Sequence, residues 1–122
     1  MIKLNIFVKL ISVKWKITYY NEKVRGAIDQ WPLGIRAFYA RTTEKMKIYG
    51  PNLGMPFTRP MGQGLFEIRA KGKEGIGRAF FCTIVGYEIV ILHEFIKKSN
   101  KTPRKEIDIA RQRLKEVKND HP

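Results

Sequence analysis

Three consecutive strand-like runs in the second half of the chain constrain the fold more than any other feature. Runs rich in β-branched and aromatic residues occupy residues 65–70, 77–85 and 88–95, and they are separated by the glycine-rich segment 71–75 and by Gly86-Tyr87. Parallel strands need a crossover of a dozen or more residues, whereas short connections join antiparallel neighbours. The sequence therefore predicts an antiparallel meander in this half of the chain.

Apolar residues near the N-terminus alternate with other residues, and the phase of the alternation shifts once. The first phase covers residues 2–10 and the second covers residues 11–19. A period of two is typical of a strand, and a change of phase is typical of a bulge. We expect a strand over residues 15–20, where the pattern is strongest. For residues 1–13 the sequence leaves two interpretations open, an extension of the domain or an artefact of the assigned start codon.

Between residues 22 and 50 the apolar positions follow a helical period. Pro32 and Gly34 divide this segment into two helices, because proline lacks the N–H that a helix interior requires. The second helix is expected over residues 33–49, with Gly50 in the left-handed conformation at its end and Pro51 preventing its continuation. The segment is thus predicted to form a helical hairpin.

The remaining segments complete a predicted α+β domain. Four glycines and three prolines between Gly50 and Gly64 predict a loop. Near the C-terminus, Thr102 is expected to cap a helix that has Pro103 at its first position. One face of that helix carries Ile107, Ala110, Leu114 and Val117. The resulting order is strand, two helices, three antiparallel strands and one helix, packed as a single domain over residues 1–122 with the helices against one sheet.

The charge of the chain indicates an anionic partner. Twenty-four Lys and Arg residues against 11 Asp and Glu residues give a formal net charge of +13 at pH 7. Such a charge favours encounter with nucleic acid and supplies affinity through phosphate contacts. A solvated basic surface, a membrane surface and an acidic protein partner are alternatives that charge alone leaves open.

Several common classes of protein are disfavoured by what the chain lacks. Cys82 is the only cysteine, so neither an intrachain disulfide nor a multi-cysteine zinc site can form. His93 and His121 lie far apart, and the glycines of residues 72–77 do not stand at the entry to a predicted helix. No apolar stretch approaches the ~20 residues of a membrane span. We expect a soluble cytoplasmic protein without a membrane association, a metal or a cofactor.

A strip of cations on the predicted meander is the best candidate site. Alternation places Glu67, Arg69 and Lys71 on the face opposite Phe66, Ile68 and Ala70. Other basic or titratable residues that the meander could add are Lys73, Arg78, His93, Lys97 and Lys98. These residues also fit ordinary solvent-facing positions of a half-exposed sheet. Cations of this kind can nonetheless stabilise a phosphate and, where their pKa is lowered, transfer protons during RNA cleavage by its own 2′-hydroxyl.

Five short motifs carry a resemblance to a known family. They are LGMP at residues 53–56, GLFEIR at 64–69, RAFF at 78–81, LHEFIKK at 92–98, and KTP at 101–103 before an Ile-x-x-Ala-x-x-Arg helix. In this order and spacing they closely resemble the phage-derived HigB-like branch of the RelE/ParE toxin superfamily. The resemblance covers residues 15–114 and implies the microbial-ribonuclease-like RelE fold.

The resemblance implies the toxin of a type II toxin–antitoxin pair, a metal-independent endoribonuclease that cuts messenger RNA in the ribosomal A site and so inhibits translation. Position by position, it assigns catalytic cations to Arg69, Arg78, Lys97 and Lys98. It extends less directly to Lys71, Lys73 and His93, which we assign to RNA binding, although His93 also fits a structural role in the sheet.

The same resemblance leaves two other functions open and implies a partner. ParE toxins share the scaffold but inhibit DNA gyrase, and a phage protein of this fold can also bind nucleic acid without cleaving it, because fold does not fix function. The family further implies a cognate antitoxin, usually with a helix-turn-helix DNA-binding domain. Such a partner would also neutralise the excess positive charge.

Overall fold

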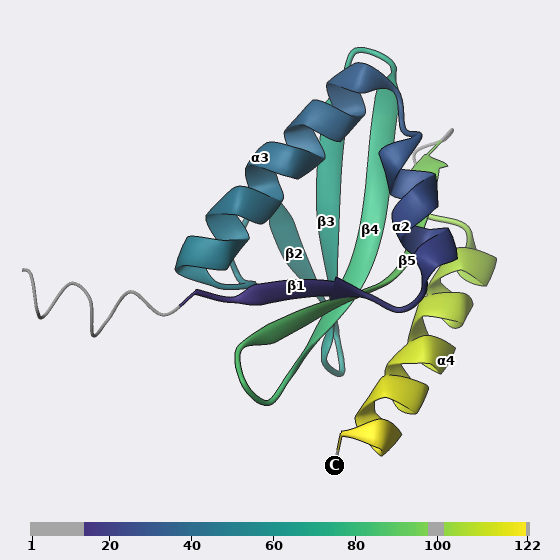
Figure 1. The fold of residues 1–122 in the computed structure, drawn as a ribbon. Helices are drawn as coiled ribbons and strands as arrows, with labels where there is room; N and C mark the ends of the chain where they lie inside the picture. Colours follow the sequence, from purple (N-terminus) through teal and green to yellow (C-terminus); the bar gives the residue numbers. More distant parts are fainter. Residues whose placement is uncertain (1–13, 98–101, 122) are drawn as a thin grey trace, which may run out of the picture.

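The protein forms one mixed sheet with helices on both faces. A computed structural model describes residues 14–97 and 102–121. Its elements are β1 (Lys16–Tyr19), α2 (Glu22–Asp29), α3 (Leu33–Tyr49), β2 (Thr58–Gly62), β3 (Leu65–Gly72), β4 (Gly75–Ile84), β5 (Glu88–Lys97) and α4 (Arg104–Asp120). The five strands stand in the order β1-β5-β4-β3-β2 (Figure 1). This is the α+β arrangement expected from the sequence, and it is consistent with a RelE-like fold.

The predicted meander is confirmed. β3 pairs antiparallel with β4, with Arg69 opposite Arg78, and β4 pairs antiparallel with β5, with Arg78 opposite Phe95. The turn between β4 and β5 contains Gly86 with φ 93° and Tyr87 with φ 61°. Positive φ at both positions suits a tight turn that follows the twist of its strands. The observed strands extend the predicted ones by two residues at several ends.

β1 enters the sheet differently from the other strands. It occupies most of the predicted strand over residues 15–20, but it pairs parallel with β5, with Ile17 opposite Ile89. Parallel pairing is available here because two helices and the meander separate β1 from β5 in the chain. The sheet is therefore mostly, not wholly, antiparallel. The predicted bulge and extension fall within residues 1–13, which lie outside the described residues.

The prediction of an unbroken loop between residues 50 and 64 is wrong. Residues 58–62 form β2, an edge strand that pairs antiparallel with β3 and has a register shift between Pro60 and Gly62. Proline lacks a ladder donor, so it is tolerated at an edge, where its nitrogen need not bond to a neighbouring strand. The strand becomes stable only because β3 lies beside it, which local sequence does not reveal.

Two apolar cores lie on opposite faces of the sheet. On one face α2 and α3 pack against a cluster that includes Ile35, Ile68 and Phe81, all fully buried. On the other face α4 packs its Ala110, Leu114 and Val117 against a cluster that includes Phe80 and Leu92. The buried residues of α4 match three of the four predicted from its helical period. Figure 1 shows the helical hairpin and α4 on the two sides of the sheet.

Helices α2 and α4 begin in different ways. Asn21 caps α2, since its side chain accepts a hydrogen bond from the N–H of Val24 at 2.9 Å. The predicted cap of α4 by Thr102 is wrong: Pro103 occupies the N-cap position, without a side-chain hydrogen bond. Pro103 therefore precedes the first helical residue instead of occupying it.

Candidate nucleic-acid interface

Three of the four residues predicted to be catalytic gather on one face of the sheet. Arg69 of β3 and Arg78 of β4 are cross-strand partners, and the register pairs Ile76 of β4 with Lys97 of β5. Alternation places these cations on the same face as Leu65, Phe80 and Phe95, which is the face that α4 partly covers. Lys98 lies outside the described residues.

A buried carboxylate lies at the centre of this group. Glu67 is 0% exposed, and its Oε1 accepts hydrogen bonds from Arg78 Nη1 at 2.5 Å and from Arg59 Nε at 2.9 Å. We call Arg59, Arg69, Arg78 and Lys97 around Glu67 the cation cluster. Because it holds four cations and one carboxylate, the cluster keeps an excess of positive charge.

The structure buries Arg78 more deeply than the sequence suggested. Its exposed fraction is 2%, and the Arg78–Glu67 contact is a buried ion pair that joins β3 and β4. Arg59, in contrast, keeps 43% of its side chain exposed while contacting the same carboxylate. Arg59, Arg69 and Lys97 are therefore the members of the cluster that solvent can reach.

Arg59 was missed by sequence reasoning, and so was the central position of Glu67. Arg59 belongs to β2, where Pro60 and Gly62 favoured a loop, and only the pairing of Arg59 with Glu67 brings it into the cluster. Alternation did place Glu67 beside Arg69 on one face. Its burial depends on neighbours from two other strands, which no local pattern contains.

Hydrogen bonding within the cluster is incomplete among the described residues. Glu67 Oε2, Arg69 Nε and Arg78 Nε are buried and have no hydrogen-bond partner there. More than nine in ten buried polar groups are normally satisfied, so these three atoms are exceptions. They lie in the buried part of the cluster, beneath the partly exposed Arg59 and Lys97.

Lys97 is a partly buried lysine close to several arginines. This burial together with the charges of Arg78, Arg69 and Arg59 lowers its pKa, while Glu67 acts in the opposite direction. A lowered pKa brings an ammonium group closer to the range in which it can give up and regain a proton near neutral pH.

The other predicted RNA-binding residues lie around the cluster. Lys71 and Lys73 are exposed at the end of β3 and in the turn that follows it. His93 contacts Glu106 of α4 through Nε2 at 2.7 Å, and its ring stacks on Phe80. These contacts match the structural role that the sequence left open for His93.

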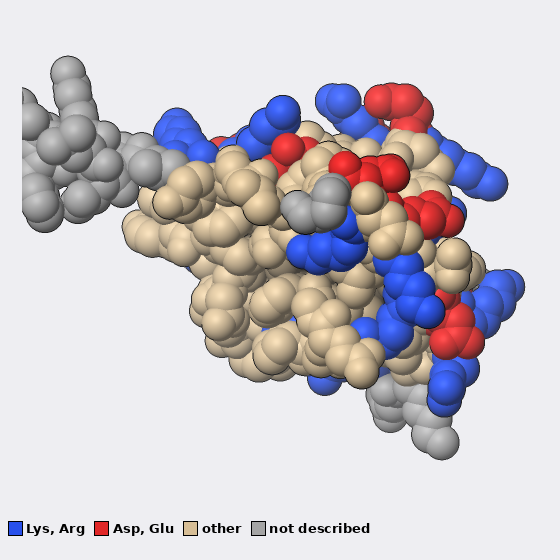
Figure 2. Space-filling view, turned by 90° about the horizontal axis from the view of Figure 1, so that it is seen from below, with Lys and Arg blue, Asp and Glu red and all other residues tan. Residues whose placement is uncertain are grey.

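The charged side chains are unevenly distributed over the surface. In the view from below, uncharged side chains cover a broad area and most Lys and Arg side chains lie along its margins (Figure 2). Two arginines of α4 make hydrogen bonds within the fold. Arg111 donates to the carbonyls of Met61 and Gly62, and Arg113 donates to the carbonyl of Leu92. Arg111 thereby joins α4 to the end of β2, the strand that carries Arg59.

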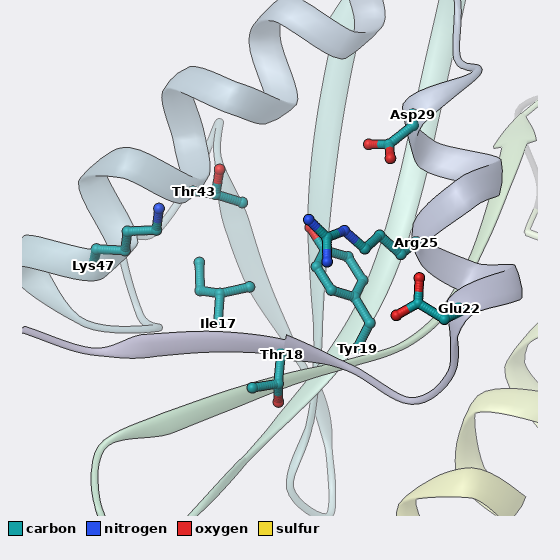
Figure 3. Close-up of a pocket in the computed structure, with 8 residues that line it drawn as sticks. All are labelled: Ile17, Thr18, Tyr19, Glu22, Arg25, Asp29, Thr43 and Lys47. Atoms are coloured by element: carbon teal, nitrogen blue, oxygen red, sulfur yellow. The ribbon is translucent and has the colours of Figure 1, made fainter.

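A hollow of about 500 Å³ lies elsewhere, between β1, α2 and α3. Figure 3 shows Arg25 reaching from α2 over the ring of Tyr19, with Lys47 on the opposite wall. The acidic residues Glu22 and Asp29 also line it, so its charges cancel. The hydroxyl of Tyr19 bonds to that of Tyr39, whose burial raises its pKa. The hollow thus lacks the excess positive charge of the cation cluster.

The described part of the chain contains neither a candidate metal-binding group nor a candidate membrane-spanning helix. Within residues 14–97 and 102–121, no three His, Cys, Asp or Glu side chains come together as a set that could hold a metal ion. Among the same residues no helix has both the length and the apolar character needed to cross a membrane. Cys82 is buried, which raises its pKa to about 11, so it is a poor nucleophile at neutral pH.

Comparison with known proteins identifies one family. The family model described as phage-derived protein Gp49-like (DUF891) matches residues 27–115. This range runs from α2 into α4 and includes every residue of the cation cluster. No curated protein matches the chain.

Proposed function

The chain belongs to the phage-derived Gp49-like family, within the RelE/HigB-like toxin superfamily, and from this premise we propose that it is the toxin of a type II toxin–antitoxin pair. We place it in the HigB branch and propose that it is a ribosome-dependent, metal-independent endonuclease that cuts messenger RNA in the A site. The observation that carries this proposal is the cation cluster, where solvent-accessible Arg59, Arg69 and Lys97 surround a buried ion pair.

The proposed reaction uses the RNA's own 2′-hydroxyl as the nucleophile. Its oxygen attacks the adjacent phosphorus in line, the bond from phosphorus to the 5′-oxygen breaks, and a 2′,3′-cyclic phosphate and a 5′-hydroxyl result. One proton leaves the 2′-oxygen and one reaches the 5′-oxygen, so no metal or redox partner is required. Arg69 and Arg59 stabilise the charge of the phosphate, because guanidinium groups bind phosphate oxygens through paired hydrogen bonds.

Lys97 is the group we assign to proton transfer. Its lowered pKa brings it closer to the range in which a lysine exchanges a proton near neutral pH, and the burial that contributes to this shift strengthens electrostatic interactions there. Arg78 contributes positive charge from within the sheet while bound to Glu67. Lys71 and Lys73, which are exposed, extend the basic surface along the RNA in this proposal. The ribosome supplies the alignment of the messenger, which is itself a large part of the catalytic effect.

A protein with a net charge of +13 requires a partner that limits its binding to other polyanions. Membership of a toxin family suggests an antitoxin in this role. We propose that this antitoxin carries a helix-turn-helix DNA-binding domain and that the pair acts in the cytoplasm, where the ribosomes are.

The test is cleavage of a defined messenger on purified ribosomes, with the cut sites mapped by primer extension. We expect the wild-type chain to cut within codons at the A site, and Lys97→Ala and Arg69→Ala each to lower the rate about a hundredfold. Lys23→Ala removes one exposed positive charge from α2, far from the cluster, and serves as the matched control with unchanged cleavage.

Two outcomes would overturn the proposal. Folded Lys97→Ala and Arg69→Ala variants that cut as fast as the wild type would remove the cluster from the reaction. A chain that leaves messengers intact while its expression causes a DNA-damage response would instead indicate gyrase inhibition, the activity of ParE toxins.

A further inference from the structure

Glu67 has an unusual combination of burial and connectivity. Its carboxylate is fully buried, and a single oxygen, Oε1, accepts hydrogen bonds from two arginines that belong to different strands. Arg59 comes from β2 and Arg78 from β4, so Glu67 of β3 links three adjacent strands at one point. The positions of these two guanidinium groups therefore depend on one side chain.

Direct contact between Glu67 and a substrate is excluded by its burial. No part of the residue is exposed, and its second oxygen, Oε2, is also inaccessible. Any effect of Glu67 on the proposed reaction must therefore pass through the residues that it contacts or through its charge. In both cases the effect reaches the partly exposed members of the cation cluster, Arg59, Arg69 and Lys97.

The charge of Glu67 also acts on Lys97. Among the charges with the largest effects on Lys97 are those of Arg78 of β4, Arg69 and Glu67 of β3, and Arg59 of β2. In this group the three arginines repel a protonated lysine and Glu67 attracts it. Without the carboxylate, the cluster would consist of like charges crowded on one face, an arrangement that disfavours the charged form of every member.

We propose that Glu67 is the positioning residue of the cation cluster: it holds Arg59 and Arg78 in place and sets the charge that surrounds Lys97. This inference rests on the nuclease function proposed above, since the cluster positions an RNA phosphate only if the chain binds RNA. Glu67 thereby decides how strongly the cluster stabilises the phosphate and at which pH Lys97 exchanges its proton.

The test compares two substitutions with opposite expected effects on Lys97. Glu67→Gln removes the attracting charge among the largest effects on Lys97, so the pKa of Lys97 falls further. Arg59→Ala removes a repelling charge from a half-exposed position, so the pKa of Lys97 rises. NMR titration of the Lys97 ε-methylene group reports both shifts without reference to activity, and the pH profile of RNA cleavage is expected to move in the same two directions.

The kinetics provide a second measurement. We expect Glu67→Gln to lower kcat about tenfold to a hundredfold with a small change in KM, because displacement of the two arginines misplaces groups that act in the transition state. Glu94→Gln is the matched control, since Glu94 is a partly buried carboxylate of β5 that bonds to Trp31 on the other face of the sheet. It should change neither the Lys97 titration nor the pH profile.

Each result decides a specific claim. If the wild type cleaves RNA but Lys97 titrates identically in wild type, Glu67→Gln and Arg59→Ala, the positioning role is wrong and the nuclease proposal stands. If Lys97 shifts as expected but no form of the chain cleaves RNA, the nuclease proposal fails. If Glu67→Gln does not fold, Glu67→Asp decides, because it keeps the negative charge but shortens the side chain that holds Arg59 and Arg78: slower cleavage in a folded Glu67→Asp variant supports the inference, and cleavage at the wild-type rate overturns it.

Discussion

Glu74 Oε2 accepts a hydrogen bond from the backbone N–H of Gly34 at 3.0 Å, so that the turn between β3 and β4 caps the start of α3. Pro32, the N-cap residue of α3, makes no side-chain hydrogen bond. A carboxylate at this place also lies at the positive end of the helix dipole. The contact lowers the pKa of Glu74 and joins the helical hairpin to the meander.

Glu74→Gln is expected to destabilise the protein at neutral pH and to have little effect in acid. The pKa of Glu74 is lowered in the folded chain, mainly by its bond to Gly34, so its contribution is complete above the pKa of the unfolded carboxyl. That contribution is lost as the pH falls through the lower pKa of the folded form. Thermal unfolding of wild type and variant over a pH series measures the difference, which should shrink in acid.

The control for this measurement is Glu44→Gln. Glu44 is an exposed carboxylate of α3 whose partner is Lys47, three residues along the same helix. Exposed pairs of this kind contribute little to stability. A difference for Glu74→Gln that is no larger than that for Glu44→Gln, or one that is constant with pH, would contradict the capping role.

Two glycine substitutions are expected to change stability in opposite directions. A Cβ at Gly77 would lie 2.7 Å from Ile35 Cγ2 and 2.7 Å from Trp31 Cζ3, whereas a Cβ at Gly26 in α2 would meet nothing within 4 Å. Gly77→Ala should therefore destabilise the protein by about 1–3 kcal/mol through overpacking. Gly26→Ala should stabilise it by about 0.5–1 kcal/mol, because alanine is the better helix former.

Urea unfolding of the two variants checks this prediction. Equal effects of Gly77→Ala and Gly26→Ala would mean that α3 does not pack closely on β4. The close approach of α3 to the sheet also accounts for Gly72 and Gly77, which lie in the meander and do not form a phosphate-binding loop. At Gly72 an added Cβ would lie 2.6 Å from the backbone nitrogen of Ile35. These glycines let the helix lie against the sheet.

The parts of the fold that were predictable are those specified by local pattern. Alternation and short turns defined the meander, and Pro32 and Gly50 marked the limits of α3. β2 was not predictable, because Pro60 and Gly62 are unfavourable in most strands and the strand depends on its partner β3. Tertiary pairing therefore overrode the local signal.

The candidate site, like the fold, was predictable from the sequence only in part. Alternation correctly placed Arg69 on one face, and antiparallel pairing brought Lys97 and Arg78 to the same region. Local sequence contained no sign that Arg78 is buried, since burial arises from the bond to Glu67 and from the strands on either side. The place of Arg59 in the cluster was not predictable either, because Arg59 lies on β2 and that strand was not predicted.

His93 offers a test of structural against RNA-binding roles. It contacts Glu106 at 2.7 Å, and Phe80 lies against its ring with an interplanar angle of 7°. His93→Ala is expected to destabilise the protein by about 1–2 kcal/mol and to speed amide hydrogen exchange in the first turns of α4. A double-mutant cycle with Glu106→Ala measures the coupling between the two side chains. Loss of RNA affinity in a variant of unchanged stability would instead support direct contact with RNA.

The buried pair of Glu67 and Arg78 leads to a prediction about stability that is independent of catalysis. Arg78→Met removes the guanidinium and leaves a fully buried carboxylate with Arg59 as its remaining hydrogen-bond partner. Breaking a buried ion pair on one side costs about 3–5 kcal/mol, because the remaining charge loses its compensation. Urea unfolding of Arg78→Met should show a loss of this size, whereas Lys23→Ala should leave stability within about 0.5 kcal/mol of the wild type.

Replacing both partners separates the structural role of the pair from its role in the cluster. The double variant Glu67→Leu with Arg78→Met buries no charge at either position, and it should regain most of the stability lost in Arg78→Met. It should still cleave RNA poorly, because it lacks the positive charge of Arg78 and the carboxylate that holds Arg59. A double variant as unstable as Arg78→Met would show that poor packing at these positions, and not an unpaired charge, causes the loss of stability. A stable double variant with full cleavage would show that Arg59, Arg69 and Lys97 act without the ion pair beneath them.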